Sequence, residues 1–542
     1  MQEKIDVLII GAGASGLTAA LAAHEEGASV MVLEKGAQLG GSAAISGGIV
    51  WMPNNHLMEK NGLQDSPEEG MAYFKSLNHG DIREEMLKAL VNEGPAALAK
   101  LVQLDALSLS LLEGYPDYYL DRPGAKPEGG RAMDHELFAF GELGAWAEKI
   151  YSAPDIPRLM LRETPLGGAS GYIEPEELER RVDADERGWG QAMVARLLKA
   201  CLDRKIVPNL SSPVESISPS GDEWLVTVKN ADGQKSSSQI TVSRGVIIAT
   251  GGFEWNEQLR QTFLKGPLDA PASPPMNQGD GLKLAMSVGA GLGNMTSAWW
   301  VPTVSIPGNN WPDGSQRSMP VLIERTLPHT ILVNAQGKRF CNEANNYSAL
   351  AGAFHAFNPE TYDYANLPAY LIFDHQYKMK YPLAYAMPGE ETPEWIVKSD
   401  TLLGLAENLG IDPEQLNETV MTFNQSVADG IDREFNRGAS DYDRFYGDRS
   451  REGVSATLGS ISNGPFYACE IKFGALGTNG GALTDAMSRV VDVNGKIIPG
   501  LFAAGNVMAA ATGGVYAGAG GTLGPALTFG FIAGREAAQR NK

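Results

Sequence analysis

The first forty residues alternate apolar runs with short turns. Residues 5–10 form a continuous apolar run, as in strands that are buried on both faces of a parallel sheet. A glycine-rich turn follows at residues 11–16, and the Ala-rich stretch 17–27 then predicts a helix. Residues 28–33 predict a second strand, which ends at Glu34. This order of strand, glycine turn, helix, strand and acid predicts an α/β nucleotide-binding unit.

Each glycine of the turn has an expected role. Gly11 allows the tight turn, and Gly13 lets the backbone approach a pyrophosphate at the positive end of the helix. Gly16 permits close packing of the helix on the strand. Glu34 stands where a carboxylate accepts hydrogen bonds from an adenosine ribose. We therefore expect a dinucleotide at this turn.

A second glycine-rich loop, residues 40–48, follows Glu34 and favours FAD over NAD. A flavin needs such a loop because its ribityl chain and ring run along the backbone. The loop contains no His, so we expect the FAD to be bound non-covalently. Two distant apolar runs, residues 246–253 and 498–506, also include glycine turns. Together these segments predict a nucleotide domain assembled from both ends of the chain.

The predicted FAD-binding residues lie on these turns and on neighbouring segments. They are Gly11, Gly13, Ala14, Ser15, Gly16, Glu34, Lys35, Gly40, Gly41, Ser42, Ser46, Gly47, Gly48, Val214, Ala249, Thr250, Gly251, Gly505, Asn506, Gly521, Leu523, Ala526 and Leu527.

The chain has 542 residues, which exceeds the usual size of one hydrophobic core and predicts two or more lobes. The expected fold class is α/β: a Rossmann-like FAD-binding domain, with a parallel sheet and helices on both faces, and an inserted α+β domain. We expect the FAD-binding domain at residues 1–276 and 465–542, and a substrate-capping domain at 277–464. Residues 123–187, with the stretch Gly129–Asp134, suggest an added lid or oligomer contact.

Composition narrows the classes of partner. The formal charge of −21 disfavours nucleic acid and anionic membranes, which both require clustered positive charge, and fits a neutral or apolar small molecule. The three cysteines form no disulfide framework, and no group of residues has metal-ligand spacing, so we expect no metal. The sequence contains no secretory signal and no apolar stretch of transmembrane length, which predicts a cytoplasmic protein.

These turns, together with the glycine cluster of residues 520–530, resemble the fumarate reductase and succinate dehydrogenase flavoprotein superfamily. Members of that superfamily close the flavin site with a C-terminal helix, which residues 520–530 would open here. The resemblance implies that free N–H groups and the positive helix end stabilise negative charge at the N1–O2 edge of the reduced flavin.

The residues that would bind substrate indicate which branch of this superfamily the chain resembles. Arg339–Glu343 is followed by Tyr347 in the slot of the catalytic Arg of soluble fumarate reductases. The segment Leu476–Gly481 lacks the expected His residues, and Gly520 replaces the C-terminal Arg. In these departures the chain is similar to the 3-ketosteroid Δ1-dehydrogenases. The segments that carry this resemblance are 115–119, 298–300, 342–347, 435–438 with 442–446, 476–481 and 515–520.

The resemblance implies a mechanism. Tyr516 and the N–H of Gly520 correspond to the family's two donors to the ketone oxygen, and Tyr347 to the base that removes a proton at carbon 2. A hydride from carbon 1 then passes to flavin N5, and an external electron acceptor is required. Tyr118 corresponds to the tyrosine that assists Tyr347, although Tyr115 and Tyr119 compete for this assignment.

Two alternatives stay open. One is a flavin ene-reductase of an unsaturated acid or ketone, which the missing Arg and His residues disfavour because a buried carboxylate needs cationic partners. The other is a non-catalytic flavoprotein that transfers electrons or binds a partner. Against it stands the position of Tyr347, Tyr516 and Gly520 on segments next to the flavin elements.

Overall fold

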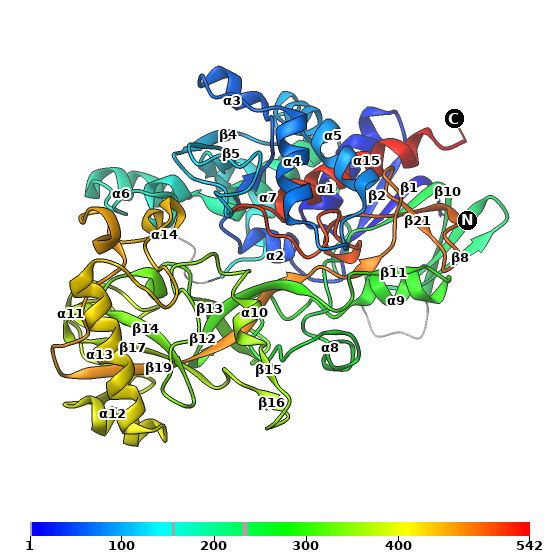
Figure 1. Cartoon of the computed structure of the whole chain (residues 1–542). Coiled ribbons are helices and arrows are strands. Elements are labelled where there is room, and N and C mark those ends of the chain that lie inside the picture. Colours follow the sequence, from blue (N-terminus) through cyan, green and yellow to red (C-terminus); the bar gives the residue numbers. More distant parts are fainter. Residues whose placement is uncertain (1–2, 154–157, 230–236, 542) are drawn as a thin grey trace. The chain divides into compact units, whose positions relative to one another are not determined.

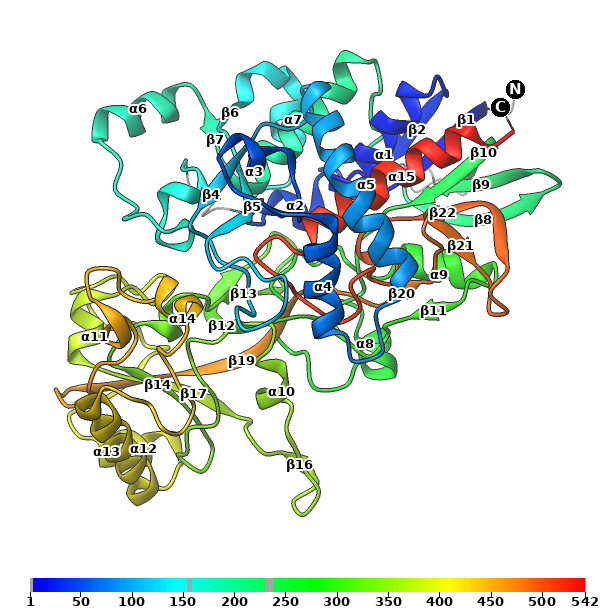
Figure 2. The ribbon, with the colours of Figure 1, turned by 45° about the horizontal axis from the view of Figure 1, so that its top comes forward.

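A computed structural model describes residues 3–153, 158–229 and 237–541, which form two compact units. Unit 1 comprises residues 1–264, 273–298 and 477–542, and unit 2 comprises 265–272 and 299–476. Figures 1 and 2 show the elements of both units. Each unit is described by itself.

The main sheet of unit 1 contains four parallel strands in the order β2-β1-β10-β22. Two further segments pair antiparallel: β21 with β22, and the β8–β9 hairpin with β10. The bounds are β1 Glu3–Ile10, β2 Val30–Leu33, β8 Val214–Ser220, β9 Glu223–Lys229, β10 Ser237–Ile248, β21 Arg489–Val491 and β22 Ile497–Ala503. The predicted fold class is thus confirmed, with a mixed sheet in place of an all-parallel one.

The strand register places the predicted cofactor turns at one edge of this sheet. Ile10 pairs with both Leu33 and Ile248, and Ile248 pairs with Ala503. The four parallel strands therefore end together, and the turns that follow them meet at the carboxyl edge. Ligands of open α/β sheets bind at this edge.

Two helices, α1 (Ala14–Glu25) and α15 (Leu523–Gln539), pack against each other beside β10 and β22 (Figures 1 and 2). Two glycines of α15 make the close approach possible. A Cβ at Gly530 would lie 2.5 Å from the carbonyl oxygen of Ser15, and one at Gly534 would lie 2.2 Å from that of Ala19. Since both distances are far below van der Waals contact, any larger residue would push the helices apart.

The stretch Gly129–Asp134 corrects a prediction. It belongs to β5 (Gly129–His135), whose seven residues are all buried. β5 pairs antiparallel with β3 (Val50–Trp51) and β4 (Leu109–Glu113) within unit 1. Arg131 of this strand pairs with the buried Asp65 and Asp117, and Asp134 pairs with the half-buried Arg162, so these charged residues can lie in the interior. The stretch is therefore part of the interior and not an added lid or oligomer contact.

Unit 2 is built on an antiparallel sheet in the order β13-β12-β19-β17-β14, with β18 beside β19. Helices α12 and α13 contribute Leu405 and Phe423 to a core that also contains Ile331 and Ala468 of the sheet. The bounds are β12 Ala298–Asn310, β13 Gln316–Pro320, β14 Thr330–Asn334, β17 Ala369–Asp374, β18 Val397–Ser399, β19 Phe466–Thr478, α12 Leu402–Leu409 and α13 Pro413–Asp429.

The unit boundaries differ from the predicted domain boundaries at three places. Residues 265–272 lie in unit 2. Residues 277–298 lie in unit 1, because α9 (Asp280–Ser287) contacts β8 and β20 (Gly481–Ala482). Residues 465–476 lie in unit 2, because β19 pairs there with β17 and β18. The assignment of FAD binding and substrate capping to these units stays a prediction.

The remaining elements are short or lie around the sheets. In unit 1 they are α2 Gly41–Ala44, α3 His56–Lys60, α4 Pro67–Leu77, α5 Glu84–Gln103, β6 Phe138–Ala139, α6 Pro175–Asp183, β7 Glu186–Arg187, α7 Trp189–Asp203, α8 Glu257–Phe263, α9 Asp280–Ser287, β11 Leu292–Gly293 and β20 Gly481–Ala482. In unit 2 they are α10 Ala351–Phe354, β15 Phe357–Asn358, β16 Asp363–Tyr364, α11 His375–Lys380 and α14 Asp441–Phe445.

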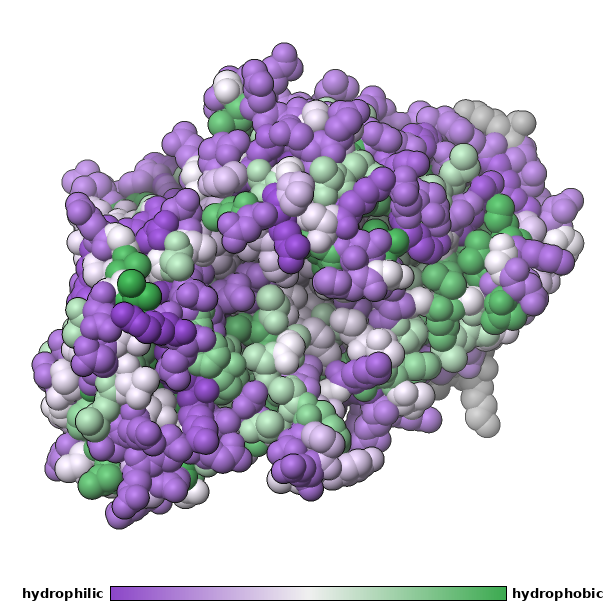
Figure 3. Space-filling view, viewed as in Figure 1, coloured by the Kyte–Doolittle hydropathy of each residue, from purple (hydrophilic) through white to green (hydrophobic). Residues whose placement is uncertain are grey.

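Figure 3 shows hydrophilic residues over most of the viewed face, with apolar residues in small patches. Among the helices that the structure describes, none has both the length and the apolar character needed to cross a membrane.

Candidate active site

Two positions of the turn after β1 leave no room for a side chain. Gly11 has a φ of +108°, and a Cβ there would lie 2.4 Å from the carbonyl oxygen of Ala249. A Cβ at Gly16 would lie 1.9 Å from the carbonyl oxygen of Gly11. Both positions therefore require glycine, for conformation at Gly11 and for space at both. A Cβ at Gly13 would meet only the carbonyl oxygen of Gly40, at 3.9 Å, so this position is open, as a pyrophosphate that approaches the start of α1 needs.

Glu34 has a function beyond the predicted ribose contact. Its two carboxylate oxygens accept hydrogen bonds from the backbone N–H groups of Ala12, at 3.0 Å, and Gly36, at 2.8 Å. Burial raises the pKa of the Glu34 carboxyl, although these hydrogen bonds and Lys35 act in the opposite direction. The carboxylate thus holds the turn that is expected to bind phosphate.

We expect Glu34→Ala to weaken FAD binding by about 1–3 kcal/mol, because the ribose contact and the support of the turn are both lost. Titration of apoprotein with FAD measures the dissociation constant. Glu59→Ala, which removes an exposed carboxylate from the same unit, is the control. Unchanged affinity in Glu34→Ala would place the ribose contact elsewhere.

The second glycine loop is tied to the first. Gly40 N–H donates to the carbonyl oxygen of Ala12 at 3.0 Å, and the Ser42 hydroxyl accepts from Asn277 Nδ2 at 2.8 Å. Asn277 Nδ2 also lies 2.6 Å from Glu254 Oε1. The Glu254 side chain is fully buried, and this burial raises its pKa. Neither Asn277 nor Glu254 was predicted, although Glu254 directly follows the glycine turn of residues 251–253.

The strand ends supply the other predicted contacts. Ala249 N–H donates to the carbonyl oxygen of Ile10 at 2.8 Å. Among the described residues, Thr250 Oγ1 is buried without a hydrogen-bond partner, which fits a ligand with polar groups. A Cβ at Gly505 would lie 2.7 Å from the Ser15 hydroxyl, so this turn also meets the start of α1. These features fit FAD, whose chemistry is the transfer of electrons between substrate and acceptor.

Lys35 and Val214, which were predicted to bind FAD, lie close to Glu34 or to residues that contact it. Lys35 forms an ion pair with Asp280 and donates to the carbonyl oxygen of Met276 at 2.5 Å. Val214 begins β8, two residues after Ser212, whose N–H donates to the carbonyl oxygen of Glu34 at 2.8 Å. Both residues are therefore close in sequence or space to the predicted adenosine end.

The start of α15 corrects one expectation. The resemblance implied free N–H groups at the start of the helix that residues 520–530 open, but those of Leu523 and Gly524 donate to the carbonyl oxygen of Gly520 at 3.1 and 3.2 Å. Gly520 itself has a φ of +91°, and a Cβ there would lie 2.4 Å from the carbonyl oxygen of Ile49. The glycine turn is thus closed by its own backbone, and the positive end of the helix dipole remains as a source of favourable field.

Tyr118 and Tyr516 lie side by side in unit 1. Their rings are stacked, with centroids 5.8 Å apart and an interplanar angle of 13°. Tyr118 N–H donates to the carbonyl oxygen of Ala517 at 3.1 Å, so the backbones are joined as well. The ring contact with Tyr516 supports the choice of Tyr118 among the three tyrosines of residues 115–119. Its implied assistance to Tyr347 stays a prediction.

Tyr347 lies in unit 2, in the turn that follows a buried ion cluster. Glu343 forms ion pairs with Arg339 at 2.8 Å and Arg437 at 3.1 Å, and Arg339 pairs with Asp432 at 2.9 Å. Burial alone would raise the pKa of Glu343, but the two guanidinium groups outweigh it and hold this pKa below its ordinary value. The cluster therefore holds the segment from Arg339 to Glu343 in place, and Tyr347 follows four residues after Glu343.

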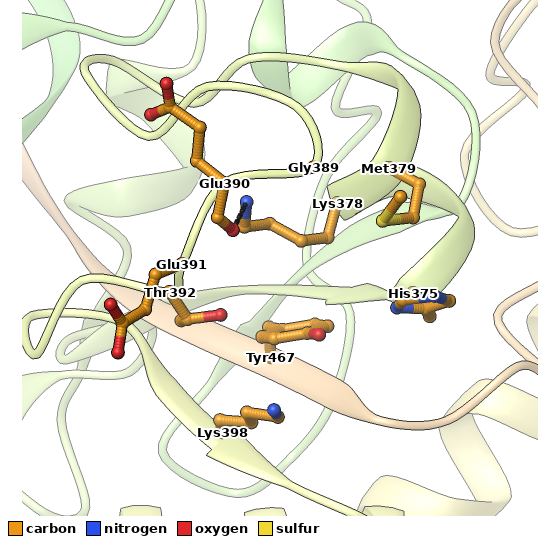
Figure 4. A pocket seen from close by; sticks show the side chains of 9 residues that line it. All are labelled: His375, Lys378, Met379, Gly389, Glu390, Glu391, Thr392, Lys398 and Tyr467. Atoms are coloured by element: carbon orange, nitrogen blue, oxygen red, sulfur yellow. Dashed lines mark hydrogen bonds between the residues drawn. The ribbon is translucent and has the colours of Figure 1, made fainter.

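A separate pocket in unit 2, of about 360 Å³, contains none of the predicted residues (Figure 4). Lys378 Nζ donates there to the carbonyl oxygens of Met387 and Glu390, each at 2.9 Å. Charged groups of both signs line this pocket, unlike the mainly apolar sites that bind ring ketones. The lining residues are His375, Lys378, Met379, Gly389, Glu390, Glu391, Thr392, Lys398 and Tyr467.

Across the described residues, no group of three or more His, Cys, Asp or Glu side chains has the arrangement of a metal site.

The chain is similar to proteins of known family over almost its full length. The family described as FAD binding domain matches residues 6–523. A 4-oxocyclohexanecarboxylate 2-dehydrogenase of Sinomonas cyclohexanicum is 38% identical over 540 residues, which cover 98% of this chain and 93% of that protein. A 3-oxosteroid 1-dehydrogenase of Mycobacterium tuberculosis is 35% identical over 562 residues, with 98% of each chain covered.

A solved structure resembles this one closely. It is the 3-ketosteroid Δ1-dehydrogenase of Sterolibacterium denitrificans in complex with 1,4-androstadiene-3,17-dione, with a TM-score of 0.89 and 36% sequence identity. The alignment covers 99% of this chain and 100% of that one. FAD as the cofactor and the expected resemblance are therefore confirmed. The chain belongs to the FAD-binding flavoprotein family, in its 3-ketosteroid Δ1-dehydrogenase-like branch.

Proposed function

We propose that this protein is an FAD-dependent dehydrogenase that introduces a carbon–carbon double bond beside the ketone of a cyclic substrate. The observation that carries the proposal is the stacked pair of Tyr118 and Tyr516 next to the glycine turn at Gly520. The similarity to dehydrogenases of ring ketones over 98% of the chain supports it.

The roles of the side chains follow from the acidity of a carbon next to a carbonyl group. The Tyr516 hydroxyl and the Gly520 N–H donate hydrogen bonds to the ketone oxygen and stabilise the negative charge that develops there. Tyr347 accepts the proton from the adjacent carbon, and Tyr118 supports this transfer. Bound FAD supplies the acceptor for the hydride that leaves the neighbouring ring carbon. An external electron acceptor then removes the two electrons.

We favour a 3-ketosteroid as substrate. A steroid suits a protein of net charge −21, because it brings no negative charge that would need a buried cationic partner. A 4-oxocyclohexanecarboxylate is the second candidate, because the relative with 38% identity carries that substrate in its name. It would require an Arg, Lys or His beside its carboxylate.

Anaerobic mixing of oxidised enzyme with a panel of ring ketones tests the proposal. A 3-ketosteroid should bleach the flavin absorbance, because its two electrons enter the FAD. Bleaching by 4-oxocyclohexanecarboxylate alone would favour the second candidate. If none of the ketones bleaches the flavin while an enone reoxidises the reduced enzyme, the protein is an ene-reductase and the proposed direction of reaction is wrong.

We expect the FAD to be bound non-covalently and the protein to act in the cytoplasm. Loop residues 40–48 contain no His that could form a link to the flavin. Denaturation in acid or guanidinium should therefore release all the yellow colour into the supernatant, where chromatography identifies intact FAD. Flavin fluorescence that stays with the denatured chain on a gel would contradict this expectation.

A further inference from the structure

A buried tyrosine outside the predicted site joins the two segments that carry the unit 1 candidates. Tyr73, on α4, is fully buried. Its hydroxyl donates to the carbonyl oxygen of Ala517 at 2.8 Å and accepts from the Tyr119 N–H at 3.1 Å. One hydroxyl group thus bonds the residue after Tyr516 and the residue after Tyr118.

The same carbonyl group completes a clamp. The oxygen of Ala517 accepts from the Tyr118 N–H as well as from the Tyr73 hydroxyl. The backbones beside the two stacked rings are therefore held by three hydrogen bonds that share Tyr73 and Ala517. The Tyr73 hydroxyl takes part in two of these three bonds.

A buried ion pair packs against the ring of Tyr73. The guanidinium carbon of Arg131 lies 5.5 Å from the centroid of the Tyr73 ring and 5.6 Å from that of Trp51, which is cation–π range. Arg131 donates to both carboxylate oxygens of Asp65 at 2.7 Å and to Asp117 at 2.8 Å. Its planar group therefore has a fixed orientation against the two rings.

This network also reaches the glycine turn. The indole N–H of Trp51 donates to Asp117 at 2.8 Å, and the backbone N–H of Trp51 donates to the carbonyl oxygen of Gly520 at 3.2 Å. A Cβ at Gly518 would lie 2.3 Å from Trp51 Nε1, so the turn packs directly on this indole. Gly520 thus contacts the network directly, and Tyr516 and Tyr118 each lie one residue from a contact with it.

We propose that Tyr73, braced by the Arg131–Asp117 pair, is a positioning residue that sets the geometry of Tyr118, Tyr516 and Gly520. The proposal rests on the proposed function. Donors to an oxyanion are effective only when their positions are fixed before the reaction, and a displacement of about 1 Å can cost about 100-fold in rate. A buried, hydrogen-bonded network next to the segments that carry these groups is a suitable means of fixing them.

The variant Tyr73→Phe removes only the hydroxyl. We expect the rate constant for flavin reduction by saturating ketone to fall about 10- to 100-fold, with flavin content unchanged. The matched control is Tyr377→Phe in unit 2, which also removes a buried hydroxyl that donates to a backbone carbonyl, that of Glu324 at 3.0 Å. The control should leave this rate constant unchanged even if it lowers the melting temperature.

A double variant separates positioning from general loss of structure. When Tyr516→Phe is already present, adding Tyr73→Phe should slow flavin reduction by less than it does in the wild type, because one of the two oxyanion donors that Tyr73 positions is gone. Full additivity of the two effects would overturn the proposal. An unchanged reduction rate in Tyr73→Phe alone would also overturn it.

Hydrogen exchange gives a readout that needs no substrate. In the Tyr73→Phe holoenzyme, peptides that cover residues 116–120 and 515–521 should lose amide protection, while a peptide that covers β14 should keep it. Unchanged protection at both segments would overturn the clamp. If no ketone reduces the wild-type flavin, the proposed function fails, and the exchange result still decides whether Tyr73 joins these segments.

A second variant covers the case in which Tyr73→Phe does not fold. Asp117→Asn keeps the size of the side chain and removes the charge that pairs with Arg131. Loss of protection in the same two peptides, with a slower flavin reduction, is the expected result. Normal protection and a normal rate in Asp117→Asn would remove the Arg131–Asp117 pair from the proposal.

Discussion

Replacing Tyr516 by Phe is expected to slow flavin reduction by a bound ring ketone about 100- to 1,000-fold, which is the usual effect of losing one oxyanion donor. Folding and flavin content should stay almost normal, because the ring can still stack on Tyr118. Binding of the ketone should weaken too, since the proposed hydrogen bond from Tyr516 to the carbonyl is already made in the ground state. Anaerobic stopped-flow absorbance over a range of ketone concentrations measures both effects.

Tyr347→Phe should differ from Tyr516→Phe in one respect. A base that acts on a C–H bond contributes little to ground-state binding, so the rate of reduction should fall by a comparable factor while affinity is retained. Tyr172→Phe and Tyr362→Phe are controls, because these tyrosines are 66% and 83% exposed and lie in units 1 and 2 respectively. Normal reduction rates with lowered melting temperatures at both Tyr347 and Tyr516 would identify them as packing residues and remove the mechanism.

The second large effect is expected at Glu343, in the buried ion cluster before Tyr347. Glu343→Gln keeps the shape of the side chain but leaves Arg437 buried without its carboxylate partner. Loss of one member of a buried pair lowers the free energy of unfolding by about 3–5 kcal/mol. Denaturant unfolding followed by circular dichroism measures this change, and slower flavin reduction should accompany it if the cluster orients Tyr347.

The pH dependence gives an independent check on Glu343. The pKa of this carboxyl is lowered in the folded protein, so its stabilisation is present above its ordinary pKa of 4.5 and is lost as the pH falls through the lower folded value. The difference in unfolding free energy between wild type and Glu343→Gln should therefore shrink below pH 4.5. Asp429→Asn, in an exposed pair, should change stability by less than about 1 kcal/mol at any pH. A constant difference between wild type and Glu343→Gln across the acid range would mean that the Glu343 charge does not stabilise the fold.

Local sequence determined the cofactor-binding part of this protein. The Gly11–Gly16 turn, Glu34 and the 40–48 loop could be predicted because each requirement is met by a residue and its immediate neighbours: an apolar run forms the strand, and glycine permits the positive φ and the close contacts. Because these strands pair in parallel, the turns that follow them meet at the carboxyl edge of the sheet. The family's segments likewise indicated Tyr347, Tyr516 and Gly520.

Only the tertiary structure decided which residues support that site. Tyr73 and Arg131 are 58 residues apart in the sequence, with Asp117 between them, yet Tyr73 bonds Ala517, which lies 444 residues away. No periodicity or motif marks such a contact, because it depends on how α4, β5 and the C-terminal turn pack together. The stretch Gly129–Asp134 suggested a lid or an oligomer contact for the same reason. Whether a charged residue is exposed or buried depends on partners that only the folded chain brings within reach.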